Sequence, residues 1–93
     1  MLETIHPKYI MSVYPKAGRP YNPIHNEIDG STATIINLNV GERGWVAYET
    51  FHNEWHRLHL SIVEDVMTSE NGDITVTTTN TVYKFAKINR HND

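Results

Sequence analysis

Apolar and polar residues alternate with a period of two through most of the chain after residue 31. Because successive side chains of a strand point to opposite faces, this alternation predicts half-buried β-strands. The segments with this pattern are residues 32–40, 45–51, 55–66, 73–79 and 81–88. The stretches between them suit turns, and they are Gly41–Gly44, His52–Glu54, Ser69–Gly72 and Asn80.

The same alternation predicts which side chains share a face. In residues 32–40 the larger apolar side chains of one face are Ile36, Leu38 and Val40. In residues 45–51 one face carries Trp45, Ala47, Glu49 and Phe51, and the other carries Val46, Tyr48 and Thr50. In residues 55–66 one face carries Leu58, Leu60 and Ile62, and the other carries Trp55, Arg57, His59, Ser61 and Val63. A helix is the alternative for this last segment, because three of its large side chains also fall at helical spacing, but the Leu-His-Leu alternation favours a strand.

Residues 1–30 follow a different pattern, because they contain all four prolines of the chain. Proline removes a backbone donor and interrupts helices, so we predict an irregular arm with only a short strand around residues 9–14. The expected fold is a single mainly β domain over residues 1–93, with an arm at 1–30 and a β core at 31–90. The core is a small five-stranded antiparallel sheet or an SH3-like barrel.

Composition narrows the class of protein. The chain has 93 residues, no cysteine and a net charge of −3, so one hydrophobic core without disulfides is expected in a cytoplasmic protein. No segment is apolar enough for a membrane span, and no membrane partner is expected. Residues 24–80 hold nine acidic residues against two arginines, a balance of −7 that disfavours direct nucleic-acid binding. An acidic surface suits a protein partner with a basic groove, although a solvated acidic face explains the same charges.

Three histidines, His52, His56 and His59, form the one group that suggests metal chemistry. Neutral imidazoles bind zinc, and three of them with an open position make a hydrolytic site. The ring nitrogens converge only if residues 52–59 are helical, whereas in a strand His56 and His59 point to opposite faces. Solvated histidines in a polar hairpin are therefore the preferred interpretation, and no cofactor is expected.

Aromatic residues suggest a binding surface instead. Trp45, Tyr48, Phe51, Trp55, Tyr83 and Phe85 exceed what one small core needs, so some are expected to stay exposed. Trp55 shares a predicted face with Arg57 and His59, and it is the expected anchor. The residues predicted to contact a partner or ligand are Trp55, Arg57, His59, Glu49, Glu54 and Tyr48.

The stretch from Leu58 to Phe85, with LHLSIVEDV and GDITVTTTNTVYKF, resembles small β-rich accessory proteins of phages and other mobile elements. This resemblance covers about a third of the chain and implies a non-enzymatic inhibitor of host defence, such as an anti-CRISPR protein, that acts in the host cytoplasm by occupying a partner protein. An oligomeric protein that sequesters a nucleotide signal is the alternative, and a histidine-based metal-dependent hydrolase is the second alternative. Pairing of exposed strand edges makes a homodimer or higher oligomer a further expectation.

Overall fold

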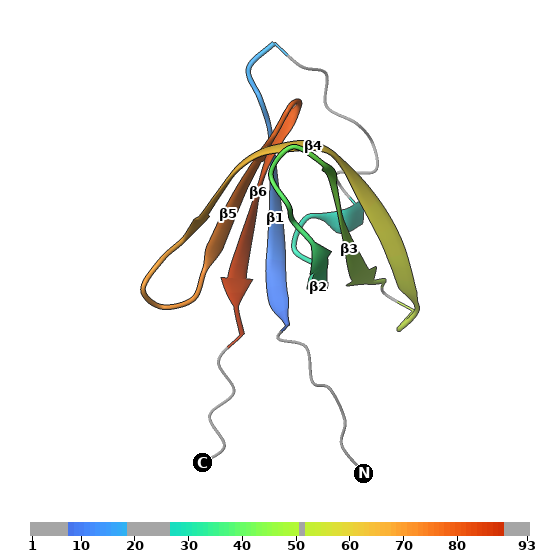
Figure 1. The fold of residues 1–93 in the computed structure, drawn as a ribbon. Helices are drawn as coiled ribbons and strands as arrows, with labels where there is room; N and C mark the ends of the chain where they lie inside the picture. The colour runs from blue at the N-terminus through green and yellow to red at the C-terminus, as the bar shows by residue number, and fades with distance from the viewer. Residues whose placement is uncertain (1–7, 19–26, 51, 89–93) are drawn as a thin grey trace.

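The chain forms a closed antiparallel β-barrel in which each strand pairs with the next one in sequence (Figure 1). The structure is a computed structural model, and it describes residues 8–18, 27–50 and 52–88. Its strands are β1 (Tyr9–Pro15), β2 (Thr32–Asn37), β3 (Arg43–Glu49), β4 (Trp55–Thr68), β5 (Ile74–Thr78) and β6 (Thr81–Lys87). β6 returns to pair with β1 and closes the barrel. The predicted mainly β class and small barrel are thus confirmed.

The prediction of five strands is wrong, because β1 is a sixth strand of the barrel. It pairs with β6 along seven residues, from Tyr9 opposite Lys87 to Pro15 opposite Thr81. Proline ends this strand and does not interrupt it, which is a position where the missing donor is tolerated. The short strand predicted around residues 9–14 is present as β1, although it belongs to the barrel and not to a separate arm, and residues 1–7 and 19–26 of the predicted arm lie outside the described residues. No helix in the described ranges is long and apolar enough to span a bilayer.

β4 is the longest strand, and it arches over the barrel from one side to the other (Figure 1). Its first half pairs with β3 and its second half pairs with β5. Register shifts interrupt both ladders where the strand bends, so that β4 has one extra residue against β3 and another against β5. A β-bulge increases local bending and twist, and these two bulges turn the single strand from one sheet into the next.

The bulges also correct the predicted faces. Val63 is fully buried and Ile62 is 43% exposed, which reverses their predicted sides, because an extra residue shifts the alternation by one. A bulge in β2 between Ile35 and Asn37 has the same effect there. Ile36 is consequently exposed although it was predicted to share the face of Leu38, which packs against the core. Val40 lies in the turn before β3 and is exposed as well.

The predicted turns at 52–54, 69–72 and Asn80 agree with the structure, whereas the turn predicted at Gly41–Gly44 lies at residues 38–42, because β3 already begins at Arg43. Gly72 has φ +94° and its amide donates to the Ser69 carbonyl at 3.0 Å, which closes the hairpin between β4 and β5. Residues 50–54 connect β3 to β4, and the Thr50 amide donates to the Glu54 carbonyl at 2.8 Å. The segment before β4 is thus a hairpin connection, and residues 55–68 form a strand, so the helical alternative for 55–66 is wrong.

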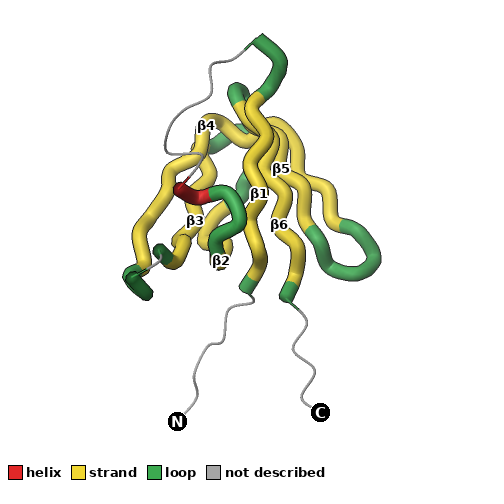
Figure 2. Tube along the Cα trace, turned by 180° about the vertical axis from the view of Figure 1, so that it is seen from behind, coloured by secondary structure: helices red, strands yellow, loops and turns green. Residues whose placement is uncertain are grey.

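The barrel interior is filled by one cluster of apolar side chains from all six strands. Phe85, Met11, Leu60, Val46, Val63 and Val76 are fully buried members, together with Ile28 from the helical turn before β2, drawn in red in Figure 2. Tyr9 packs edge-on against Phe85, with ring centroids 6.1 Å apart. Such pairs contribute beyond their buried area, so the seam between β1 and β6 is part of the core.

The buried hydroxyl of Tyr83 should make the stability of the barrel fall at alkaline pH. Burial raises the pKa of its hydroxyl above 10.0, against a smaller opposing effect of a hydrogen bond with the Thr81 side chain. The unfolded chain therefore loses this proton first as pH rises, and the free energy of unfolding should fall above about pH 10. We expect Tyr83→Phe to make this fall shallower in thermal melts between about pH 8 and 11. Tyr14→Phe, at a side chain that is 51% exposed, is the control and should melt as the wild type at each pH.

Candidate binding face on β3 and β4

Three cross-strand pairs of β3 and β4 present a continuous set of side chains to the outside of the barrel. The Cα partners are Trp45 with His59, Ala47 with Arg57, and Glu49 with Trp55. The intervening residues of β3, Val46 and Tyr48, are buried, so the three pairs lie on the outer side of the sheet. We call this set of six residues the β3–β4 outer face.

Trp45 lies between two groups from β4. Its ring stacks on the imidazole of His59, with centroids 5.5 Å apart and planes 5° from parallel. The guanidinium carbon of Arg57 lies 5.1 Å from the centroid of the same ring. A cation over an aromatic face is attracted by the ring quadrupole, so Trp45 fixes the direction of both β4 side chains. His59 and Arg57 are exposed, and their polar atoms remain available to a partner.

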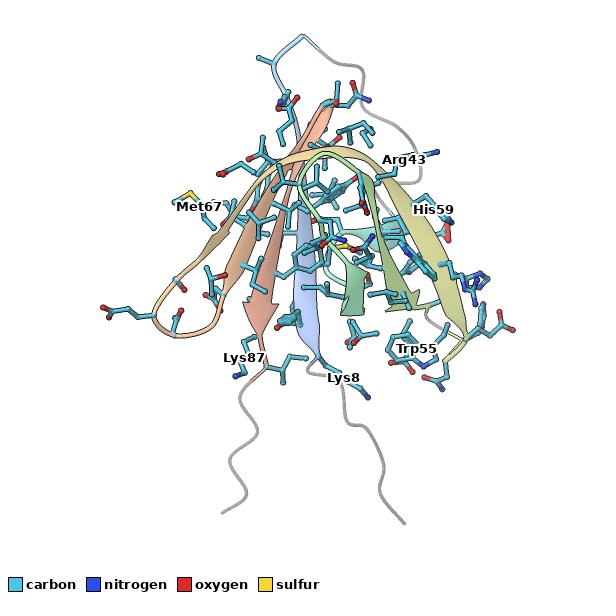
Figure 3. All side chains as sticks on the ribbon, viewed as in Figure 1. Lys8, Arg43, Trp55, His59, Met67 and Lys87 are labelled. Atoms are coloured by element: carbon cyan, nitrogen blue, oxygen red, sulfur yellow. The ribbon has the colours of Figure 1, made fainter. Side chains whose placement is uncertain are left out.

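Trp55 is the most exposed aromatic residue of this face, at 43%. The ammonium nitrogen of Lys8 lies 5.6 Å from its ring centroid. Figure 3 shows Lys8 and Trp55 near each other at one end of the barrel, with His59 further along β4. Sequence reasoning missed Lys8, because it immediately precedes β1 and only closure of the barrel brings that strand around to this side.

The other predicted site residues are divided between the two sides of the sheet. Glu49 is on the outer face opposite Trp55. Glu54 lies just before β4, and its carboxylate is 3.5 Å from Nε2 of His56. Tyr48 is 5% exposed and on the inner side, where its ring stacks on that of His56 at 5.8 Å, so it lies apart from Trp55 and Arg57. Burial, and next the nearby Glu27 carboxylate, raise the pKa of the Tyr48 hydroxyl.

The histidine group does not converge. Because residues 55–68 form a strand, His56 stacks on the inner side against Tyr48 while His59 stacks on the outer side against Trp45. His52 lies in the turn between the strands. Among residues 8–18, 27–50 and 52–88, no three histidine, aspartate or glutamate side chains are arranged to hold a metal ion. The helical geometry that a zinc site would need is therefore absent here.

Several acidic residues of the central segment have partners within the barrel. Asp29 accepts a hydrogen bond from the amide of Val13 at 2.9 Å and so ties the segment before β2 to β1. Glu64 pairs with Lys16 at 3.0 Å, and Asp73 accepts from the amide of Lys87 at 2.9 Å. These carboxylates hold segments of the chain together, and part of the acidic balance therefore has a structural use.

Two grooves lie outside the β3–β4 outer face or at its margin. One, of about 520 Å³, is lined by three carboxylates and small polar groups: Glu27, Asp29, Glu49, Ser31, Thr32, Thr50 and Asn53 with Gly30. The other, of about 550 Å³, lies on the sheet of β1, β5 and β6 beside the β4–β5 hairpin, and Tyr14, Met67 and Lys84 line it. The acidic groove adjoins the outer face through Glu49, so cationic and anionic groups meet at this margin.

Comparisons with protein-family models, with curated proteins and with solved structures found no match, so the described geometry is what supports a function for this chain.

Proposed function

We propose that this chain is a small non-enzymatic binding protein that holds a partner protein on its β3–β4 outer face. The observation that carries this proposal is the exposure of Trp55 beside Arg57 and Lys8 on a surface ordered by cross-strand pairs. Tryptophan and arginine are the residues that most often dominate the binding energy of protein interfaces. The SH3-like character of the barrel and its origin in a mobile element remain predictions, and so does the inhibition of host defence.

The face is suited to binding because its side chains are already ordered before a partner arrives. Trp45 is stacked on His59 and contacted by Arg57, while both strands are held by the barrel ladder. Side-chain ordering at an interface costs about 0.5–1.5 kcal/mol for each immobilised long side chain, and contacts made in advance reduce that cost. A small rigid barrel can therefore bind through few residues.

A nucleotide is the second candidate ligand, because an exposed indole beside two cations can stack on a base and pair with a phosphate. Lys8 over Trp55 and Arg57 over Trp45 are the contacts that favour it. A protein partner fits better, because Glu49 lies on the same face as Arg57 and a protein surface can present groups of both charges to them, whereas a nucleotide presents mainly anionic phosphate.

The test is a pull-down from extracts of the natural host cell with immobilised chain, followed by calorimetry with the purified partner. We expect Trp55→Ala to weaken binding by at least about 2 kcal/mol, roughly thirtyfold, and Arg57→Ala to weaken it as well. The control is Met67→Ala, because this side chain is 63% exposed on another part of the barrel and should leave affinity unchanged.

Circular dichroism should first show that all three variants are folded, which is expected because the substituted side chains are exposed. A partner that binds Trp55→Ala and wild-type chain equally would refute the assignment of this face. Native mass spectrometry of the purified chain tests the nucleotide alternative. A nucleotide that is bound to the wild-type chain and lost from Arg57→Ala would show that this face binds a small ligand instead of a protein.

A further inference from the structure

Among the described residues, the first half of β4 has a neighbouring strand on one side only. Residues 55–62 of β4 pair with β3 on one side, and the pairing with β5 begins only at Val63. Figures 1 and 2 both show this part of β4 at the lateral margin of the barrel. Among the described residues, only those of β3 form backbone hydrogen bonds with residues 55–59. Within the described part of the chain, alternate amides and carbonyls on the other side of residues 55–59 thus have no backbone partner, and they can pair with a further strand.

The side chains along this edge alternate in chemistry as well as in direction. Arg57 and His59 point to the outer side, where both are exposed. Leu58, between them, lies on the inner side and packs partly against the core. Directly opposed residues on neighbouring strands contact each other, so an added strand would place one set of its side chains against Arg57 and the His59 imidazole and the other against Leu58.

This alternation selects the occupant of the edge. In a second copy of the chain, paired antiparallel with matching faces, one of the registers with the longest overlap would set Arg57 directly against Arg57. Like charges directly opposite each other destabilise a strand pair. A strand with carboxylates at alternate positions and β-branched residues between them would instead complement both sides.

We propose that the β4 edge binds an extended acidic segment of the partner protein as an additional strand, with alternating Glu or Asp facing Arg57 and His59. This inference rests on the proposed binding function and names how the partner is held. Main-chain hydrogen bonds supply affinity in this mode, and the alternate side chains supply specificity. Trp55, next along the outer side, offers a surface for a β-branched residue at one end of the added strand.

The test uses the whole chain and a fluorescent acetylated peptide of sequence Thr-Val-Glu-Val-Glu-Val-Thr, with binding followed by fluorescence anisotropy. We expect it to bind at least about tenfold more tightly than the same peptide with lysine at both glutamate positions. Arg57→Glu should lower affinity for the acidic peptide and raise affinity for the lysine peptide. The matched control is Lys84→Glu on β6, away from this edge, which should leave the ranking of the two peptides as in the wild type.

Two N-methylated acidic peptides separate strand addition from plain charge attraction. One carries methyl groups on the valine nitrogens and the other on the glutamate nitrogens, and one of the two must lose binding if the peptide pairs with β4 through its backbone. Hydrogen exchange should also slow at amides within residues 55–61. Equal binding of both methylated peptides, or a homodimer of the free chain paired through β4, would overturn the proposal. If these peptides fail while Trp55→Ala still abolishes binding of the partner, the outer face remains the binding site and only the strand addition is wrong.

Discussion

Replacing Ile28 by alanine is expected to lower the free energy of unfolding by about 2–5 kcal/mol. The side chain is fully buried in the same cluster as the side chains of the barrel strands, although it comes from the helical turn before β2. Truncation removes apolar contacts and leaves a cavity that the closed barrel cannot readily collapse. Since domains of this size are stable by only about 5–15 kcal/mol, the variant should lose a large part of its stability.

Urea unfolding followed by tryptophan fluorescence measures this effect, and an unchanged m-value would show that the two-state transition is retained. Ile36→Ala is the matched control, because this side chain is 46% exposed and its truncation should cost less than about 1 kcal/mol. Equal losses in the two variants would contradict the position of Ile28 in the core.

Gly44→Ala is expected to destabilise the barrel by about 1–3 kcal/mol, although alanine usually favours a strand over glycine. A β-carbon at Gly44 would lie 2.9 Å from Cγ2 of Val63 and 3.1 Å from the Asn37 carbonyl oxygen. Val63 is fully buried and β-branched, so it cannot rotate away, and the Asn37 oxygen belongs to the backbone, whereas the third neighbour, Cδ2 of Leu38 at 3.1 Å, is the end of a flexible side chain. The glycine is therefore required where β3 passes closest to the bend of β4.

A double-mutant cycle with Val63→Ala identifies the cause of this loss. Val63→Ala alone removes buried contacts, but it also removes the atom nearest to the new methyl group. The two substitutions together should thus cost less than the sum of the single ones, by about 0.5–3 kcal/mol in the free energy of unfolding. Additive costs would show that Gly44 is needed for another reason.

Much of the barrel could be predicted from the alternation of apolar and polar residues. The strands after residue 31 and the turns at 52–54 and 69–72 lie where the pattern indicates them, because both signals are local. The faces failed at the bulges, where Ile62 and Val63 exchanged sides. A β-bulge has no characteristic amino-acid composition, so the sequence does not show where the extra residue lies. The associated feature here is Gly44 on the neighbouring strand, which leaves room for the side chain of Val63.

Part of the candidate site could also be predicted from the sequence, and part could not. Trp55, Arg57 and His59 share the outer face as predicted, since they precede the bulges of β4 and keep the period of two. Lys8 could not be assigned to this face, because its contact with Trp55 joins the segment before β1 to the start of β4, far apart in sequence.

Because β1 and β6 are the strands that close the barrel, closure depends on the order in which the strands are synthesised. β1 pairs with β2 at only two positions but with β6 at seven. During synthesis, β2 to β5 can pair with their neighbours as they emerge. β1 makes most of its pairs only after β6 has emerged, because closing the long loop between these two strands costs entropy that their pairing must offset. A ribosome-bound chain that stops before residue 81 should therefore hold an open sheet, and translation of β6 turns that sheet into a barrel.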